Sequence, residues 1–129
     1  MAHPNEDLLR RGFDAFGRGD MAAIAELFAD EIVWHVPGNS PLSGDYKGRD
    51  SVLGFLGKSA ELSGGTLKVE VHDILANDEH GVALVRNTAQ RGGKSLDNHA
   101  VQVFHIRDGK AVETWFHPGD QAATDKFWS

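Results

Sequence analysis

The stretch from Thr66 to His117 constrains the fold more than any other part of this chain. Its apolar residues recur at every second position in four consecutive runs, and side chains with that period alternate between the two faces of a β-sheet. The breaks between the runs, at 77–81, 91–94 and 107–110, hold Gly together with Asp, Asn or another Gly, residues that tolerate the positive φ of hairpin turns. Hairpins make neighbouring strands antiparallel, so the pattern predicts a four-strand meander. The runs are Leu67-Val69-Val71, Val82-Leu84, Val101-Val103, and Val112 with Trp115 and Phe116.

The N-terminal segment predicts two short amphipathic helices joined by a glycine turn at 17–19. Asn5 is the expected N-cap of the first helix and Asp20 that of the second, because both side chains can accept backbone N–H bonds. The two apolar stripes need a partner surface, and the predicted sheet is the only large one. The stripes consist of Leu8, Leu9, Phe13 and Phe16, then Met21, Ile24, Leu27 and Phe28.

A further strand is predicted from Glu31 to Val36, where the sequence is rich in β-branched and aromatic residues. The loop that follows, 37–48, is rich in Gly and Pro and contains Tyr46. Loops of this kind often form the rim of a site, and Tyr46 is either part of such a rim or a packing anchor.

Two more helices are expected. One runs from about Asp50 to Leu62, is capped by Asp50 or Ser51, and ends at the glycine pair 64–65. A short C-terminal helix is expected over 121–128. The inner face of the 50–62 helix holds Val52, Phe55, Leu56 and Ser59.

Composition narrows the class of protein. The chain has 129 residues, 40% apolar and 25% charged, which predicts one globular domain over residues 1–129. It has no cysteine, so disulfides and thiolate chemistry are excluded. No apolar run has membrane-spanning length and the N-terminus has no signal-peptide core, so we expect a cytoplasmic protein without a membrane partner. The net charge of −6 and the scattered basic residues argue against a nucleic-acid partner.

The predicted order of elements is helix, helix, strand, helix, four-strand meander and helical tail, an α+β arrangement with the helices on one face of the sheet. This order resembles the SnoaL-like branch of the nuclear-transport-factor-2-like, or ketosteroid isomerase-like, superfamily. The resemblance implies a cone-shaped curved antiparallel sheet, made of the meander and an N-terminal strand, wrapped over three N-terminal helices. It rests on Leu27-Phe28-Ala29-Asp30-Glu31 running into Trp34-His35-Val36-Pro37-Gly38, on 44–48, on 107–110, and on Glu113 to Trp115.

The same resemblance implies a deep pocket for a small hydrophobic ligand and a homodimer that pairs through the outer sheet face. Members of the superfamily include ketosteroid isomerases, limonene epoxide hydrolases and polyketide cyclases. The residues agree in part, since the strands have apolar side chains on both faces, as expected if one face lines a cavity and the other meets a partner. No cofactor is expected.

The catalytic residues that ketosteroid isomerases use are not all present in this sequence. The resemblance puts Val36 where ketosteroid isomerases have their Asp general base, and valine cannot take a proton. The neighbouring His35 could serve, because imidazole titrates near neutral pH, but strand alternation places it opposite Trp34 and Val36. The acid of the isomerase oxyanion hole corresponds to Gln102, whose amide can still donate a hydrogen bond.

The catalytic residues of limonene epoxide hydrolases and of SnoaL-type cyclases are also only partly matched by this sequence. Arg86 matches the arginine of the hydrolase Asp-Arg-Asp set, but Thr88 stands where an acid belongs and the second Asp falls on Phe116 or His117. SnoaL-type cyclases rely on an Asp near the end of the last strand, a role that His117 or Asp120 could fill. Asp120 is also well placed to be a helix N-cap, and His117 either lines the pocket or caps the edge of the sheet.

Strand alternation predicts which residues face the pocket: Asn98, Ala100, Gln102 and Phe104 inward, and His99, Val101, Val103 and His105 outward. The histidines form no compact ligand motif, so we expect no metal site. Two hypotheses remain, an acid–base enzyme and a non-catalytic binding or dimerisation module. The candidate catalytic residues are His35, His117 and Asp120, and the candidate substrate-binding residues are Trp34, Tyr46, Phe55, Arg86, Gln102 and Trp115.

Overall fold

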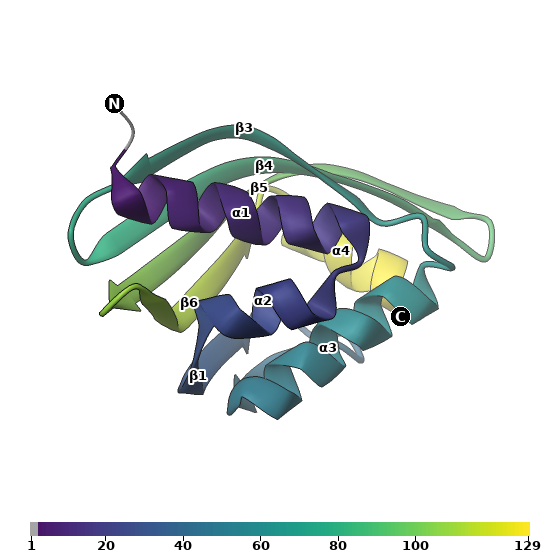
Figure 1. Cartoon of the computed structure of the whole chain (residues 1–129). Helices are drawn as coiled ribbons and strands as arrows, with labels where there is room; N and C mark the ends of the chain where they lie inside the picture. Colours follow the sequence, from purple (N-terminus) through teal and green to yellow (C-terminus); the bar gives the residue numbers. More distant parts are fainter. Residues whose placement is uncertain (1–2) are drawn as a thin grey trace.

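A curved sheet of six strands wraps around three helices in the computed structural model, which describes residues 3–129 (Figure 1). The strands lie in the order β2-β1-β6-β5-β4-β3. The predicted meander is confirmed as β3 to β6, and each of its neighbouring pairs is antiparallel. The elements are α1 (Pro4–Arg18), α2 (Met21–Leu27), β1 (Phe28–Val36), β2 (Gly44–Lys47), α3 (Arg49–Leu62), β3 (Lys68–Ala76), β4 (His80–Arg91), β5 (Lys94–Arg107), β6 (Lys110–Pro118) and α4 (Gln121–Trp128).

The predicted α+β class, with helices segregated to one face of the sheet, is confirmed. In Figure 1 the long strands β3, β4 and β5 arch over α1, while α2 and α3 lie below it. The core fills the space between these layers, where Leu9, Ile24 and Val52 from the helices pack with Ala83 and Phe104 from the strands. Burial of these apolar surfaces is the main force that holds the helices against the sheet.

The sheet is mixed rather than wholly antiparallel. β1 pairs with β2 in antiparallel fashion but with β6 in parallel, because the chain leaves β1 and returns to its side only after the whole meander. The strand predicted at 31–36 begins earlier in the structure, at Phe28. The loop that follows it contains the short strand β2. The sequence of β2 gave no strand signal because Gly44, Asp45 and Lys47 are poor strand formers.

Two of the predicted helix caps are wrong. His3, not Asn5, caps α1: its Nδ1 accepts the backbone N–H of Asn5 at 3.0 Å, and Pro4 occupies the first turn, where no N–H is needed. The side chain of Asn5 instead donates to the carbonyl oxygens of Asn77 and Asp78 in the β3–β4 turn, at 2.9 and 3.1 Å. Asn5 therefore fastens the start of α1 to the sheet.

The cap of α3 is also different, because Gly48 takes that position with φ 91° and no side-chain bond, and Asp50 and Ser51 lie inside the first turn. The other two caps are confirmed. Asp20 accepts the N–H of Ala23 at 3.1 Å and Asp120 accepts that of Ala123 at 3.0 Å. Within residues 3–129, none of the helices is both long enough and apolar enough to cross a membrane.

Candidate ligand-binding cavity

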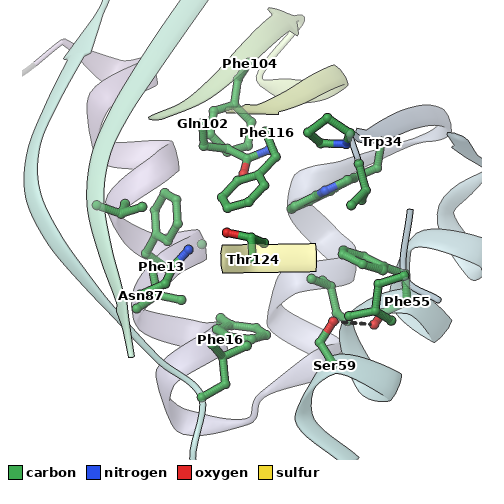
Figure 2. Close-up of a pocket in the computed structure, with 18 of the residues that line it drawn as sticks. Phe13, Phe16, Trp34, Phe55, Ser59, Asn87, Gln102, Phe104, Phe116 and Thr124 are labelled. Atoms are coloured by element: carbon green, nitrogen blue, oxygen red, sulfur yellow. Dashed lines mark hydrogen bonds between the residues drawn. The ribbon is translucent and has the colours of Figure 1, made fainter. Parts of the chain in front are cut away.

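A cavity of about 170 Å³ lies between the concave face of the sheet and the helices. Its wall is mostly aromatic and aliphatic, and Figure 2 shows Phe13 and Asn87 on one side with Trp34 and Phe55 across from them. Inward side chains of β4 and β5, among them Val85, Asn87 and Phe104, form the sheet side of this space. The aromatic side chains of the wall are Phe13, Phe16, Phe28, Trp34, Phe55, Phe104, Phe116 and Trp128.

The indole of Trp34 lies close to three other aromatic rings of the wall. It lies 5.9 Å from the ring of Phe28, 5.8 Å from Phe55 and 6.5 Å from Phe104, and the last pair meets edge to face at 88°. Phe104 in turn meets Phe13 of α1 edge to face at 6.2 Å. Rings in these arrangements attract one another beyond their burial alone, so the wall joins sheet and helices as one packed unit.

Three amide side chains on the inner face of β4 and β5 are among the polar groups of the wall: Asn87, Asn98 and Gln102. The Nδ2 of Asn98 donates to the backbone oxygen of Asp120 at 3.2 Å and to Oγ1 of Thr124 at 2.8 Å. The Nε2 of Gln102 donates to Oγ1 of Thr114 at 2.5 Å.

The third amide differs from the other two. The Oδ1 of Asn87 is buried and has no hydrogen-bond partner among residues 3–129. Such unpaired buried acceptors are uncommon in folded proteins, because burial removes water without replacing its hydrogen bond.

Among the described residues that line the cavity, Asp125 is the only ionisable one. Its Oδ1 accepts a hydrogen bond from Nε2 of Gln121 at 2.9 Å, one turn earlier on α4. Gly38 lies directly against this pair, and a Cβ added there would collide with both side chains. Gly38 also has a φ of 91°, which favours glycine, and a larger residue there would push the ends of these two side chains aside.

The structure brings three of the predicted binding residues, Trp34, Phe55 and Gln102, into the cavity wall. The predicted alternation along β5 is also observed: Asn98, Gln102 and Phe104 line the cavity, and Ala100 is buried. His99 at the same level is exposed on the other face.

The other three predicted binding residues do not line the cavity, which corrects their expected position. Trp115 lies between Thr114 and Phe116, whose side chains point inward, so alternation turns it to the outer face. Arg86 is turned outward in the same way and forms a two-point ion pair with Asp97, at 2.7 and 2.8 Å. Tyr46 packs on the back of Phe55 at 4.6 Å and donates its hydroxyl to the carbonyl oxygen of Leu42.

His35, a predicted catalytic residue, lies on the outer face of the sheet. Its Nδ1 is 2.7 Å from Oδ1 of Asp45, its Nε2 is 2.6 Å from Oε2 of Glu113, and its ring stacks on Trp115 at 5.5 Å. The hydrogen bond with Glu113 is the largest cause that raises the pKa of His35 above 6.5, with Asp45 adding to it and burial opposing it. The two carboxylates thus favour the imidazolium form.

The two other predicted catalytic residues also lie outside the cavity wall. His117 is exposed on the outer face of β6, and Asp120 is exposed at the N-terminus of α4, where its carboxylate caps the helix. His35, His117 and Asp120 are not among the residues that line the cavity, and their catalytic role stays a prediction. Among residues 3–129, no group of three or more His, Asp or Glu side chains is placed to hold a metal ion.

Comparison with known proteins shows to which family this chain belongs. The family model of the SnoaL-like domain matches residues 9–114, which is more than half of the chain. The chain belongs to the SnoaL-like family. This family is a branch of the nuclear-transport-factor-2-like superfamily, so the resemblance seen in the sequence is confirmed.

Individual relatives of this SnoaL-like chain are also similar over nearly their full length. An uncharacterized protein of Mycobacterium tuberculosis is 37% identical over 124 residues, 95% of each chain. The solved structure of Bal32a, from a soil-derived mobile gene cassette, is 38% identical with a TM-score of 0.95 and covers 98% of this chain and 97% of that one. A putative SnoaL-like polyketide cyclase from Jannaschia is 21% identical with a TM-score of 0.78, covers 98% and 92%, and shares the fold.

The SnoaL-like chain has polar cavity residues that sequence reasoning missed, and the signals that mark them are simple. Asn87 follows Val85 at an inward position of β4, so the same alternation that found Gln102 applies to it. Four residues of α4 line the cavity at spacing i, i+3, i+4 and i+7, the pattern of one helix face. They are Gln121, Thr124, Asp125 and Trp128.

Proposed function

We propose that this SnoaL-like protein binds a small, largely apolar molecule of one or two rings in the cavity between sheet and helices. The observation that supports this most strongly is the cavity itself, about 170 Å³ with a mostly aromatic and aliphatic wall. An apolar cavity of about 150 Å³ is large enough to hold benzene, whereas sites for drug-sized ligands span roughly 300–1,000 Å³. A four-ring steroid is therefore too large for the space as it stands.

The family gives this proposal its context. The Jannaschia neighbour is described as a putative polyketide cyclase, and its cone of sheet and helices is the same fold at 21% identity. Conversion of a bound molecule is a second candidate function, favoured by the presence of Asp125 in the wall. A carboxylate held in place by Gln121 can accept a proton from a bound ligand. Replacement of Asp125 by Asn should then abolish turnover and leave binding intact.

The proposal is tested by filling the cavity. Val69 lines it from β3, so Val69→Phe places a ring in the space that the ligand would take. Calorimetric titration with naphthalene should show binding to the wild type, and the affinity should fall at least about tenfold in the variant. Leu84→Phe is the matched control, because Leu84 lies on the outer face between two buried inward positions, Ala83 and Val85.

Circular dichroism establishes that both variants are folded. The proposal is wrong if the wild type binds none of a series of one-ring and two-ring apolar compounds. It is also wrong if Val69→Phe binds naphthalene as tightly as the wild type does, because the ligand would then occupy another place.

A further inference from the structure

The wall of the cavity contains a buried side-chain acceptor whose hydrogen-bonding capacity is not used by residues 3–129. Asn87 lies on the inner face of β4, paired in register with Val69 of β3 and Asn98 of β5, and all three residues line the cavity. Its Oδ1 is buried and has no partner within residues 3–129. Phe13 is its neighbour in the wall in Figure 2, so the surroundings of the amide are largely apolar.

The donor groups of the neighbouring amides are already engaged. Asn98 donates to the backbone of Asp120 and to Thr124, and Gln102 donates to Thr114, which passes its own hydroxyl hydrogen to the carbonyl oxygen of Val103 at 2.8 Å. Those two side chains are therefore fixed by the fold. The Oδ1 of Asn87 differs, because it is buried and accepts no hydrogen bond from residues 3–129.

The charge of the wall limits what that guest can be. Within residues 3–129, the lining residues include no Lys, Arg or His, and their one ionisable group, Asp125, is an acid already hydrogen-bonded by Gln121. An anionic ligand would lose its hydration without gaining a cation, which is strongly unfavourable. A neutral ligand avoids this loss.

We propose that Asn87 selects the ligand of this cavity: a neutral one- or two-ring molecule whose hydroxyl or other N–H or O–H group donates a hydrogen bond to Oδ1 of Asn87. This inference rests on the proposed binding function and adds to it the chemical class of the ligand. The bond would satisfy a buried acceptor, and buried polar groups in native proteins are rarely left without a partner. The ring system of the ligand would lie against the aromatic wall.

The test compares four probes of nearly equal size by calorimetric titration at pH 7.5. Naphthalene has no polar group, 2-naphthol has a donor, quinoline has only an acceptor, and 2-naphthoate is an anion. We expect 2-naphthol to bind about five- to tenfold more tightly than naphthalene, the amount typical of one net hydrogen bond. Quinoline and 2-naphthoate should bind no more tightly than naphthalene.

The variant Asn87→Leu removes the oxygen and keeps a γ-branched shape. It should bind naphthalene at least as well as the wild type and lose the preference for 2-naphthol. Thr88→Val is the matched control, since Thr88 is the next residue of β4, points to the outer face, and should leave the preference unchanged.

A result that contradicts the role of Asn87 can be distinguished from one that contradicts the binding function. If all probes bind and Asn87→Leu keeps the preference for 2-naphthol, or if quinoline or 2-naphthoate binds best, the role of Asn87 is wrong while the binding function stands. If no probe binds to the wild type, both the binding function and this inference are wrong.

Discussion

At the scale of single residues, the imidazole of His35 couples stability to pH. It lies between Glu113 and Asp45 on the outer face, and Glu113 is the main cause that raises its pKa above 6.5. The folded state therefore holds the proton more tightly than the unfolded state does. This contribution to stability is complete below about pH 6.5 and is lost as the pH rises through the raised pKa of the folded state.

We therefore expect His35→Gln to lower the melting temperature more at pH 6 than at pH 9. Thermal unfolding of wild type and variant across this pH range measures the difference. Glu113→Gln is the companion variant, because it removes the largest cause of the raised pKa and should weaken the pH dependence without removing the imidazole. A deficit for His35→Gln that is constant from pH 6 to pH 9 would show that the ion pairs contribute nothing.

At the scale of elements, two glycines of α3 cost stability without a structural reason. Gly54 and Gly57 are exposed in the helix, and a Cβ at either position would meet no atom within 4 Å. Each change to Ala should raise the free energy of unfolding by about 0.5–1 kcal/mol, measured by urea denaturation, because glycine loses more backbone entropy in a helix. Gly48→Ala at the N-cap is the opposing control, since its φ of 91° strains any L-residue and should destabilise the protein.

The helices and strands also show which parts of the fold local sequence patterns can predict. Local signals found α1, α2, α3, α4 and all four strands of the meander, since apolar period and turn residues are properties of short stretches. The strand β2 was missed, because it forms only by pairing with β1 and its own residues do not favour a strand. The parallel pairing of β1 with β6 was missed for a related reason, as it joins segments about 80 residues apart in the chain.

The same limit applied to the candidate site. Alternation along β5 correctly placed Gln102 in the cavity wall. In the observed register Gln102 pairs with Phe116 and Val103 with Trp115, so Trp115 shares the outer face with Val103. What a strand pattern cannot supply is the cross-strand register or the helix that closes the cavity. Asp125 was overlooked for that reason, since its position in the wall depends on how α4 docks on β5 and β6.

At the scale of the whole molecule, the outer face of the sheet has an apolar row that crosses four strands. Leu75 pairs with Val82, Val82 with Val103, and Val103 with Trp115. Leu75 is 55% exposed and the other three side chains are half-buried, because α1, α2 and α3 all pack on the opposite face. A continuous apolar row of this kind on a sheet surface is typical of a protein–protein interface.

We expect this face to pair with a second copy of the chain, as the resemblance to the superfamily implies. The change Val103→Glu places a charge at the centre of the row, and burying that charge in a symmetric interface would set two carboxylates close together. Light scattering at micromolar concentration should therefore give a dimer mass for the wild type and a monomer mass for Val103→Glu. Glu70→Gln on β3, outside the row, should remain dimeric. Since the cavity lies on the other side of the sheet, the monomeric variant should still bind naphthalene, and a wild type of monomer mass would contradict the pairing altogether.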